Sequence, residues 1–238
     1  MYELKSRVRY SEADENGVLS MQGLMNYLQD CCTMQAEDLG IGLSYLRENH
    51  IGWMVTSYQV KILGDLPSVG DDIVVKTWPY QFRGMLGYRN FTVETEEGEA
   101  LVLVDSLWIL MDIEAKKPIR LMEKMIEAYE LSPQLPGEWD LRRKLTIEDK
   151  GSERDAFTVA KMHLDTNHHM NNVNYIAAAM ACIPSQVSVK EMFISYKNAA
   201  VLGDKIHCYV AEKEDGCTVC LCDCAGDDYC VVECVFGQ

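Results

Sequence analysis

The sequence predicts an α+β fold in which one helix followed by antiparallel strands occurs twice along the chain. Three observations indicate it: an apolar helical pattern that precedes a run of strand-like segments, a second pattern of the same kind later in the chain, and a Gly-Asp pair that recurs between the same two strands of each half. Each helix would bury one face against a single curved sheet, and two such units can pair side by side into a continuous sheet.

In the first half, the predicted helix follows Ser20, a residue type that favours helix N-caps, and ends near Gly40. Leu24, Leu28 and Cys31 recur between them at helical spacing. A Glu-Glu-Gly turn separates the last two strand-like segments, which therefore form a predicted hairpin. The four segments are residues 53–62, 71–80, 87–95 and 100–112.

The second half repeats this order, with a short helix predicted from about residue 171 to residue 182 before Pro184. Its strands are predicted at residues 191–198, 204–214, 217–224 and 229–237. The recurring pairs are Gly70-Asp71 and Gly203-Asp204. Because each pair falls between the first and second strand after a helix, the sequence indicates an internal duplication.

The boundary between the halves is marked by proline, three of the six prolines lying between residues 118 and 136. A surface helix is expected at residues 121–130, before this segment continues as a linker. We therefore predict a first half at residues 1–130, a linker at residues 131–144 and a second half at residues 145–238.

The composition is that of a globular protein, with 48% hydrophobic and 25% charged residues among 238. No stretch has the roughly 18 uncharged apolar residues of a spanning helix. The first residues lack the apolar core of a secretory signal, so a cytoplasmic protein is expected. The formal net charge of −15 makes nucleic acid and anionic membrane surfaces poor partners.

Ten cysteines are present, and without a secretory signal they point to a reducing compartment. Six follow residue 216 at strand-like spacing. A zinc site usually has two paired clusters, and only Cys217 and Cys220 are spaced like one such pair. We expect these cysteines to be small buried hydrophobic side chains. The adjacent His168 and His169 would diverge in extended backbone, so no metal is expected.

Candidate catalytic residues lie just before the second helix, where Asp165, Asn167 and His169 occupy alternate positions. In extended backbone such positions point the same way, so the three side chains would converge beside the partly positive helix N-terminus. Thioester hydrolysis needs a base for water and a donor for the developing oxyanion. Asp165 or His169 could be the base, and Asn167 could orient the water.

The alternative is that these polar residues only cap the helix and bond the loop backbone. The duplication bears on this choice. Asp14 and Asn16 occupy the corresponding place in the first half, but Val18 stands where His169 would be. A purely structural pattern would serve both halves equally. An imidazole in only one half therefore suggests one active site per chain.

This motif continues from His169 as Asn-Asn-Val, a variable residue and Tyr-Ile, over residues 171–176. In this run, and in the Asn-Tyr-Leu-Gln segment at residues 26–29, the chain resembles the acyl–acyl carrier protein thioesterases of plants and bacteria. The resemblance implies a tandem (double) hot-dog fold, with two long helices each packed on antiparallel strands that form one continuous curved sheet. It also implies hydrolysis of fatty acyl–acyl carrier protein without a cofactor, with Asp165, Asn167 and His169 as catalytic residues.

One departure from the family pattern affects the mechanism. Much of the family has Glu, often followed by Cys, three residues after a Tyr on the first strand past the catalytic helix. Counted from Tyr196, those places hold Ala199 and Ala200. Without that carboxylate, Asp165 or His169 remains as the base.

Substrate contacts are predicted in the first half, which lacks the catalytic pattern. Met25 and Leu28 lie on an apolar helical stripe that could be core or could bind the acyl chain. An acidic carrier protein would need a basic patch, and three are candidates: Lys5 with Arg7 and Arg9, residues 116–117, and residues 142–144. A homodimer is also expected, because an open sheet edge invites pairing.

Three other functions remain open: hydrolysis of acyl-coenzyme A, a hydratase or dehydratase of the same general fold, and acyl binding without catalysis. No nucleotide-binding loop is evident for coenzyme A. A hydratase pairs His with an acid across two halves, whereas here Asp, Asn and His lie in one segment. Ala199 and Ala200 favour the non-catalytic alternative.

Overall fold

The computed structural model describes residues 1–143, 145 and 149–237. The chain divides into two compact units, Met1–Leu141 and Arg142–Gln238. In the part of the chain that is described, no helix has the length and apolar character needed to cross a membrane.

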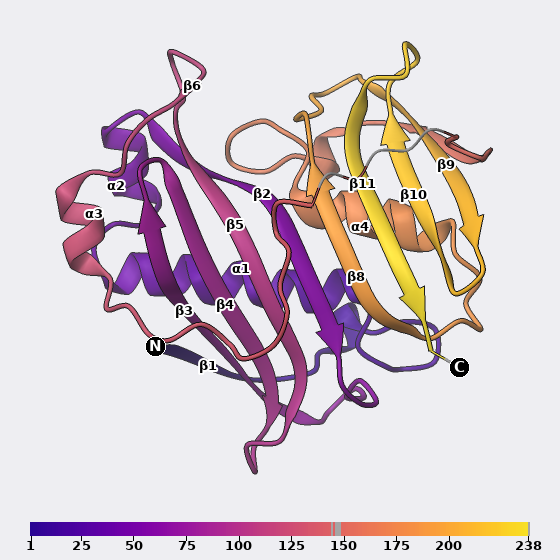
Figure 1. Ribbon diagram of the computed structural model, residues 1–238, viewed down its shortest axis with the longest axis horizontal. Coiled ribbons are helices and arrows are strands. Elements are labelled where there is room, and N and C mark those ends of the chain that lie inside the picture. Colours follow the sequence, from indigo (N-terminus) through magenta and orange to yellow (C-terminus); the bar gives the residue numbers. More distant parts are fainter. Residues whose placement is uncertain (144, 146–148, 238) are drawn as a thin grey trace. The chain divides into compact units, whose positions relative to one another are not determined.

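The first unit is an antiparallel sheet with a long helix on one face (Figure 1). Its strands lie in the order β1-β3-β4-β5-β2, and the short β6 pairs with β5. Helix α1 packs against β1 and β3. The strands are β1 Tyr2–Arg7, β2 Ile51–Ile62, β3 Asp72–Arg83, β4 Leu86–Thr95, β5 Ala100–Asp112 and β6 Lys117–Pro118. The helices are η1 Tyr10–Glu12, α1 Met21–Asp38, α2 Leu43–Glu48 and α3 Glu123–Ala128.

Helix α1 begins and ends where the sequence predicts. The Ser20 hydroxyl accepts a hydrogen bond from the Gly23 N–H at 3.0 Å, and Gly40 follows the helix with φ of 68°. Leu24, Leu28 and Cys31 are fully buried beneath the helix. The helical period of the apolar residues therefore sets both its extent and its buried face.

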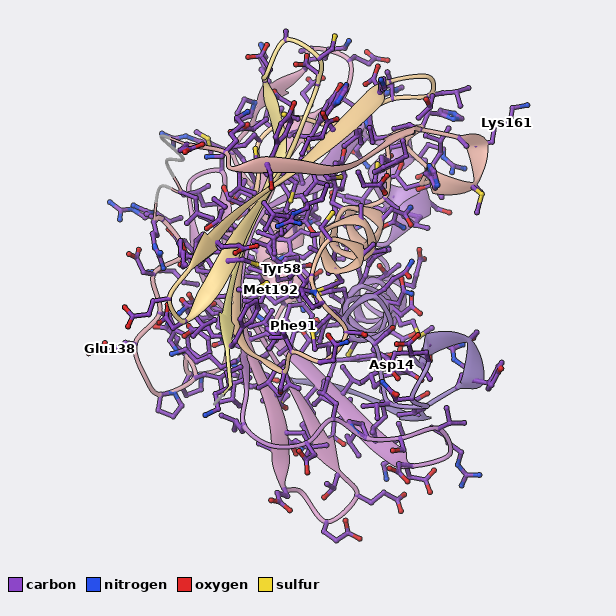
Figure 2. All side chains as sticks on the ribbon, turned by 90° about the vertical axis from the view of Figure 1, so that its right-hand side faces the viewer. Asp14, Tyr58, Phe91, Glu138, Lys161 and Met192 are labelled. Atoms are coloured by element: carbon purple, nitrogen blue, oxygen red, sulfur yellow. The ribbon has the colours of Figure 1, made fainter. Side chains whose placement is uncertain are left out.

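The other face of this sheet is covered by residues 132–141, which follow α3. The indole of Trp78 donates to the Pro133 carbonyl at 2.8 Å, and the Ser57 hydroxyl donates to the Leu141 carbonyl at 2.8 Å. Figure 2 shows Glu138 on the side of the sheet away from α1. The sheet is thus buried on both faces, and this segment lies within the first compact unit.

The second unit repeats this plan with a shorter helix. Its strands lie in the order β8-β11-β10-β9-β7, all antiparallel. Helix α4 has ten residues against eighteen in α1, which confirms the short helix predicted at residues 171–182, and Pro184 follows closely behind it. The elements are β7 Ser152–Thr158, η2 Lys161–His163, α4 Asn172–Ala181, β8 Val189–Tyr196, β9 Lys205–Lys213, β10 Gly216–Cys222 and β11 Asp228–Phe236.

The duplicated Gly-Asp turns have the same local structure in both units. Gly70 and Gly203 have φ of 96° and 93°, a backbone region that disfavours residues with a Cβ. The carboxylate of Asp71 accepts from the Ser68 N–H at 2.8 Å, and that of Asp204 accepts from the Val201 N–H at 2.9 Å. The sequence prediction of a repeated turn is confirmed at the level of individual hydrogen bonds.

Candidate functional site

The segment before α4 is a closed turn and not an extended strand. Leu164 and Met170 pair across it, and Asp165 N–H donates to the His169 carbonyl at 2.8 Å. His168 has φ of 62°, in the left-handed region. The expectation that alternate side chains converge along extended backbone is therefore wrong, because the chain reverses between Asp165 and His169.

The Asp165 carboxylate organises this turn. Its Oδ1 accepts hydrogen bonds from the backbone N–H of Asn167 at 2.8 Å and of His169 at 3.1 Å. The Asn167 side chain is exposed and the His169 side chain is half-buried. Within the described residues, neither side chain has a hydrogen-bond partner. The structure thus brings Asp165 to the backbone of the other two residues and leaves the imidazole unpaired.

Helix α4 starts three residues after His169. Asn171 is its N-cap, and the Asn171 side chain accepts from the Val173 N–H at 3.2 Å. The Asn174 side chain donates to the His163 carbonyl at 2.9 Å, which ties the first turn of the helix to the 3-10 helix η2. The helix therefore presents its partly positive end close in the chain to the imidazole, where an oxyanion would be stabilised.

The loop between β8 and β9 runs beside His169. Met170 N–H donates to the Ala200 carbonyl at 2.8 Å, and His169 pairs with Val201. Ala199 is exposed and Ala200 is fully buried, where its N–H donates to the Tyr175 hydroxyl at 2.9 Å. Ala199, where the family resemblance leads us to expect Glu, therefore lies in the chain just before the two residues that contact Met170 and His169, and it carries only a methyl group.

The carboxylate of this loop belongs to Asp204, and its hydrogen bonds hold it in place. Asp204 accepts through the same Oδ2 atom from the Val201 N–H at 2.9 Å and from the Tyr229 hydroxyl at 3.0 Å. Its role is to hold the turn. It does not replace the missing Glu.

An equivalent turn lies in the first unit, where Asp14 Oδ1 accepts from the N–H of Asn16 at 2.9 Å and of Val18 at 3.0 Å. Gly17 takes the left-handed position with φ of 78°, and Ser20 is the N-cap in place of Asn171. Turn geometry accounts for the Asp of both halves, whose carboxylate binds two backbone N–H groups. It does not account for His169, because Val18 makes the same backbone contacts.

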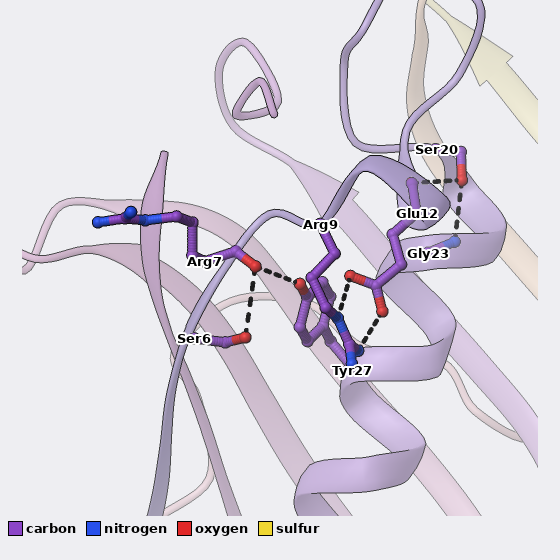
Figure 3. A network of polar contacts seen from close by, with 7 residues as sticks. All are labelled: Ser6, Arg7, Arg9, Glu12, Ser20, Gly23 and Tyr27. Atoms are coloured by element: carbon purple, nitrogen blue, oxygen red, sulfur yellow. Dashed lines mark hydrogen bonds and ion pairs between the residues drawn. The ribbon is translucent and has the colours of Figure 1, made fainter. Parts of the chain in front are cut away.

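The first unit closes its turn with an ion pair, shown in Figure 3. The Arg9 guanidinium binds the carboxylate of Glu12, a residue that is 6% exposed. The guanidinium also lies over the Tyr27 ring at 5.5 Å. The second unit has Ala160 and His163 at the corresponding positions. The two turns have the same backbone conformation. An ion pair stabilises the first turn, and the corresponding residues of the second turn cannot form one.

Met25 and Leu28, predicted to contact the acyl chain, lie on the buried face of α1. Their side chains are 2% and 0% exposed. Met34, on the same helix, is by contrast 44% exposed. The structure thus places Met25 and Leu28 in the interior of the first unit.

The three basic patches differ in how far their charges are neutralised. Arg7 pairs with Asp72 at 2.9 Å, and Arg9 pairs with Glu12. Arg143 pairs with Glu233. Lys116 and Lys117 are exposed, and no described residue forms an ion pair with either. Among the described residues of these patches, this turn between β5 and β6 thus carries two adjacent lysines without an acidic partner, and Lys5 on β1 is a third.

Two buried charges in the first unit were missed by sequence reasoning. Arg89 donates to the Gln35 side chain at 2.6 Å and to the Thr77 hydroxyl at 2.9 Å. Asp105 accepts from the Tyr80 hydroxyl at 3.0 Å, and its burial raises its pKa to about 6. Arg89 and Asp105 both lie in strands that the sequence predicts. The alternation of apolar and polar residues along a strand does not say which face of the sheet is buried.

Comparison with known proteins agrees with the tandem arrangement. Two family models match: the acyl-ACP thioesterase N-terminal domain over residues 1–129 and the acyl-ACP thioesterase C-terminal domain over residues 147–236. The palmitoyl-acyl carrier protein thioesterase of Arabidopsis thaliana is 26% identical over 207 residues, covering 80% of this chain and 50% of the relative. An oleoyl-acyl carrier protein thioesterase of the same plant is 23% identical over 203 residues, covering 78% and 56%.

Solved structures share the fold over the whole chain. An acyl-ACP thioesterase from Bacteroides thetaiotaomicron has a TM-score of 0.89 at 21% identity, covering 99% of this chain and 97% of the other. The 12:0-ACP thioesterase of Umbellularia californica has a TM-score of 0.86 at 18% identity, covering 99% and 96%. The prediction of an α+β double hot-dog fold is confirmed.

Proposed function

The chain belongs to the acyl-ACP thioesterase family, and on that premise we propose that it hydrolyses fatty acyl–acyl carrier protein to free fatty acid and carrier. The chain spans about half the length of the curated relatives it matches. The observation that carries the proposal is the His169 imidazole, which has no hydrogen-bond partner among the described residues and stands where the duplicated turn has Val18.

In the proposed reaction, His169 takes a proton from a water molecule that attacks the thioester carbonyl carbon. The N-terminus of α4 and the Asn167 amide stabilise the oxyanion of the tetrahedral intermediate. The carbon–sulfur bond then breaks, and the carrier thiolate takes the proton back from the imidazolium. Asp165 holds the turn through two backbone N–H groups, which makes it a positioning residue in this scheme.

The remaining substrate contacts are assigned to the first unit. We assign the acyl chain to the apolar interior under α1, with Met25 and Leu28 as candidate contacts. Lys116 and Lys117 are the candidate docking charges for an acidic carrier, because their ammonium groups are exposed and lack acidic partners among the described side chains.

Two further expectations belong to this proposal. The ten cysteines are free thiols in the structure, and a cytoplasmic location stays a prediction. A homodimer remains a prediction, to be tested by light scattering of the purified chain. The outermost strands β1 and β7 carry charged side chains, which disfavour pairing between edges.

The test is release of free thiol from acyl-acyl carrier protein and from the matching acyl-coenzyme A, compared between the native chain and His169→Ala. Hydrolysis of the carrier substrate that is lost in His169→Ala supports the proposal. Preference for the coenzyme A substrate would favour the acyl-coenzyme A alternative. Hydration of an enoyl thioester would identify a hydratase, and tight acyl binding without turnover would identify a binding protein.

A further inference from the structure

A second cluster of chemistry-bearing side chains lies in the second unit, on strands β10 and β11 (Figure 1). Cys220 and Cys222 are two positions apart on β10, so they share one face of the sheet, and both are buried. A register shift at Leu221 and Cys222 places Asp228 directly opposite Cys222. The two sulfur atoms and a carboxylate oxygen all lie within 4.8 Å of one another.

Packing alone does not explain this cluster. Cys220 and Cys222 lie in a buried apolar group with Phe193 and Val231, covered by Leu145. Asp228 lies at the edge of this group, half-buried and paired with Lys150, and its carboxylate accepts a hydrogen bond from the Cys220 thiol at 3.0 Å. Two thiols and a carboxylate are therefore gathered at a place where apolar side chains would fill the space equally well.

The donor set is one that zinc prefers. Thiolate sulfur selects zinc among the common divalent ions, and a carboxylate oxygen is an accepted third ligand. Cys217 and Cys220, the pair with zinc-like spacing in the sequence, lie three positions apart and so face opposite sides of β10. The candidate ligands in the structure are therefore Cys220 and Cys222, which are two residues apart, together with Asp228 on the neighbouring strand β11.

The local charges balance for a divalent ion. Two thiolates and one carboxylate with Zn²⁺ sum to one negative charge, and Lys150 supplies one positive charge. The Lys150 ammonium donates to Asp228 Oδ1 at 2.7 Å and to the Gly226 carbonyl at 2.7 Å. No hydrogen bond occupies Asp228 Oδ2 within the described part of the chain, so that oxygen is available to a metal.

A fourth ligand is offered by β9. His207 pairs directly with Cys222 across β9 and β10, at a separation where side chains meet. Its Nδ1 lies 2.5 Å from the Glu153 carboxylate. Its Nε2 is the buried side-chain polar atom for which no partner is found among the described residues. A histidine held by a carboxylate through one nitrogen, with the other nitrogen unpaired, is the usual arrangement of a metal-binding imidazole.

We propose that Cys220, Cys222, Asp228 and His207 bind one zinc ion, which joins β9, β10 and β11. The ring nitrogens of His207 do not lie within 4.8 Å of all three ligand atoms of Cys220, Cys222 and Asp228. Zinc binding therefore requires the His207 side chain to rotate toward Cys222. Two thiol protons pass to solvent as the ion binds. The site is structural and separate from the His169 turn, and Glu153 and Lys150 orient its ligands.

The test uses the full untagged chain, reduced, stripped of metal with a chelator and then desalted. Zinc added alone should bind at one ion per chain with sub-micromolar affinity and should raise the melting temperature. Cobalt in place of zinc should give the absorption band of a thiolate–cobalt bond. Binding of less than one ion per chain, or cobalt spectra without that band, would overturn the proposal.

Variants assign the ligands. Cys220→Ser, Cys222→Ser and the near-isosteric Asp228→Asn should each abolish the band, while Cys224→Ser, an exposed cysteine of the same hairpin, should not. Glu153→Gln should weaken zinc binding roughly 10- to 100-fold, as loss of a supporting carboxylate does. Circular dichroism of the metal-free variants checks that they fold. A band that survives in Cys220→Ser and Cys222→Ser marks adventitious binding and removes the site; an unchanged affinity in His207→Gln removes His207 from it.

Discussion

Val18 and His169 close equivalent turns, each accepting through its carbonyl a hydrogen bond from the N–H of an aspartate four residues earlier, at 2.7 and 2.8 Å. Each also donates a hydrogen bond from its own N–H to that aspartate's carboxylate, at 3.0 and 3.1 Å. The backbone of the turn is therefore indifferent to the side chain at this position. The chain thus contains its own control for the role of the imidazole.

The first prediction follows from that equivalence. Because valine is already compatible with this turn, His169→Val should fold as well as the native chain, while thiol release from acyl-acyl carrier protein falls about 10²- to 10⁴-fold, the usual contribution of a general base. Calorimetry and a thiol assay on the same preparation measure both. Val18→Ala in the first unit is the matched control and should keep full activity. Substantial turnover by His169→Val would remove the imidazole from the mechanism.

A second prediction separates the two candidate bases. Asp165→Asn keeps a side-chain oxygen for the two N–H groups of the turn, so it should keep at least a tenth of the native activity if His169 is the base. Asp165→Ala should lose about 1–2 kcal/mol of stability, the cost of unpairing such groups, and Asp14→Ala should lose a similar amount. Urea unfolding measures the stabilities. If Asp165→Asn is as inactive as His169→Val, the base is Asp165.

Much of the fold could be predicted because its signals are local. The N-cap at Ser20, the apolar period of α1 and the repeated Gly-Asp turns depend on neighbours a few residues apart. Strand β7 was missed because its residues are nearly all exposed and several are charged, which leaves no apolar alternation to read. The structure adds it at the outer side of β9.

The site was harder to predict because alternate spacing has two meanings. Asp165, Asn167 and His169 would share a face in a strand, but the same spacing arises in a turn where an Asp side chain bonds the N–H groups two and four residues on. The Asn16-Gly17 pair at the corresponding place of the first half was a turn signal within the sequence. The approach of Asp228 to Cys222 had no such signal, because it depends on a register shift between strands.

A third prediction concerns the missing carboxylate. Ala199 is exposed in the loop that runs beside His169, so a longer side chain can be accommodated there. Ala199→Glu should raise kcat for the carrier substrate by about tenfold, because a second carboxylate can orient the attacking water and stabilise the imidazolium. Ala199→Gln is the uncharged control and should stay near the native value. If the two variants behave alike, the charge of that side chain has no role in this chain.

The fourth prediction concerns Asp105, which is fully buried in the first unit and whose pKa is raised to about 6 by desolvation. Three hydrogen bonds, from Tyr80, Gln134 and the Ser106 N–H, oppose that shift without cancelling it. Because the folded chain holds this proton more tightly than the unfolded chain, the resulting stabilisation is complete below the ordinary carboxyl pKa and is lost as the pH rises through about 6.

The native chain should therefore lose about 1 kcal/mol more stability than Asp105→Asn between pH 5 and pH 7, as proton linkage requires for a shift of this size. Denaturant unfolding of both proteins at the two pH values gives the difference directly, since every other titrating group cancels in the comparison. Asp72→Asn is a useful control, because that exposed carboxylate pairs with Arg7 and its pKa is lowered. If Asp105→Asn and the native chain lost the same stability between pH 5 and pH 7, Asp105 would be ionised throughout that range.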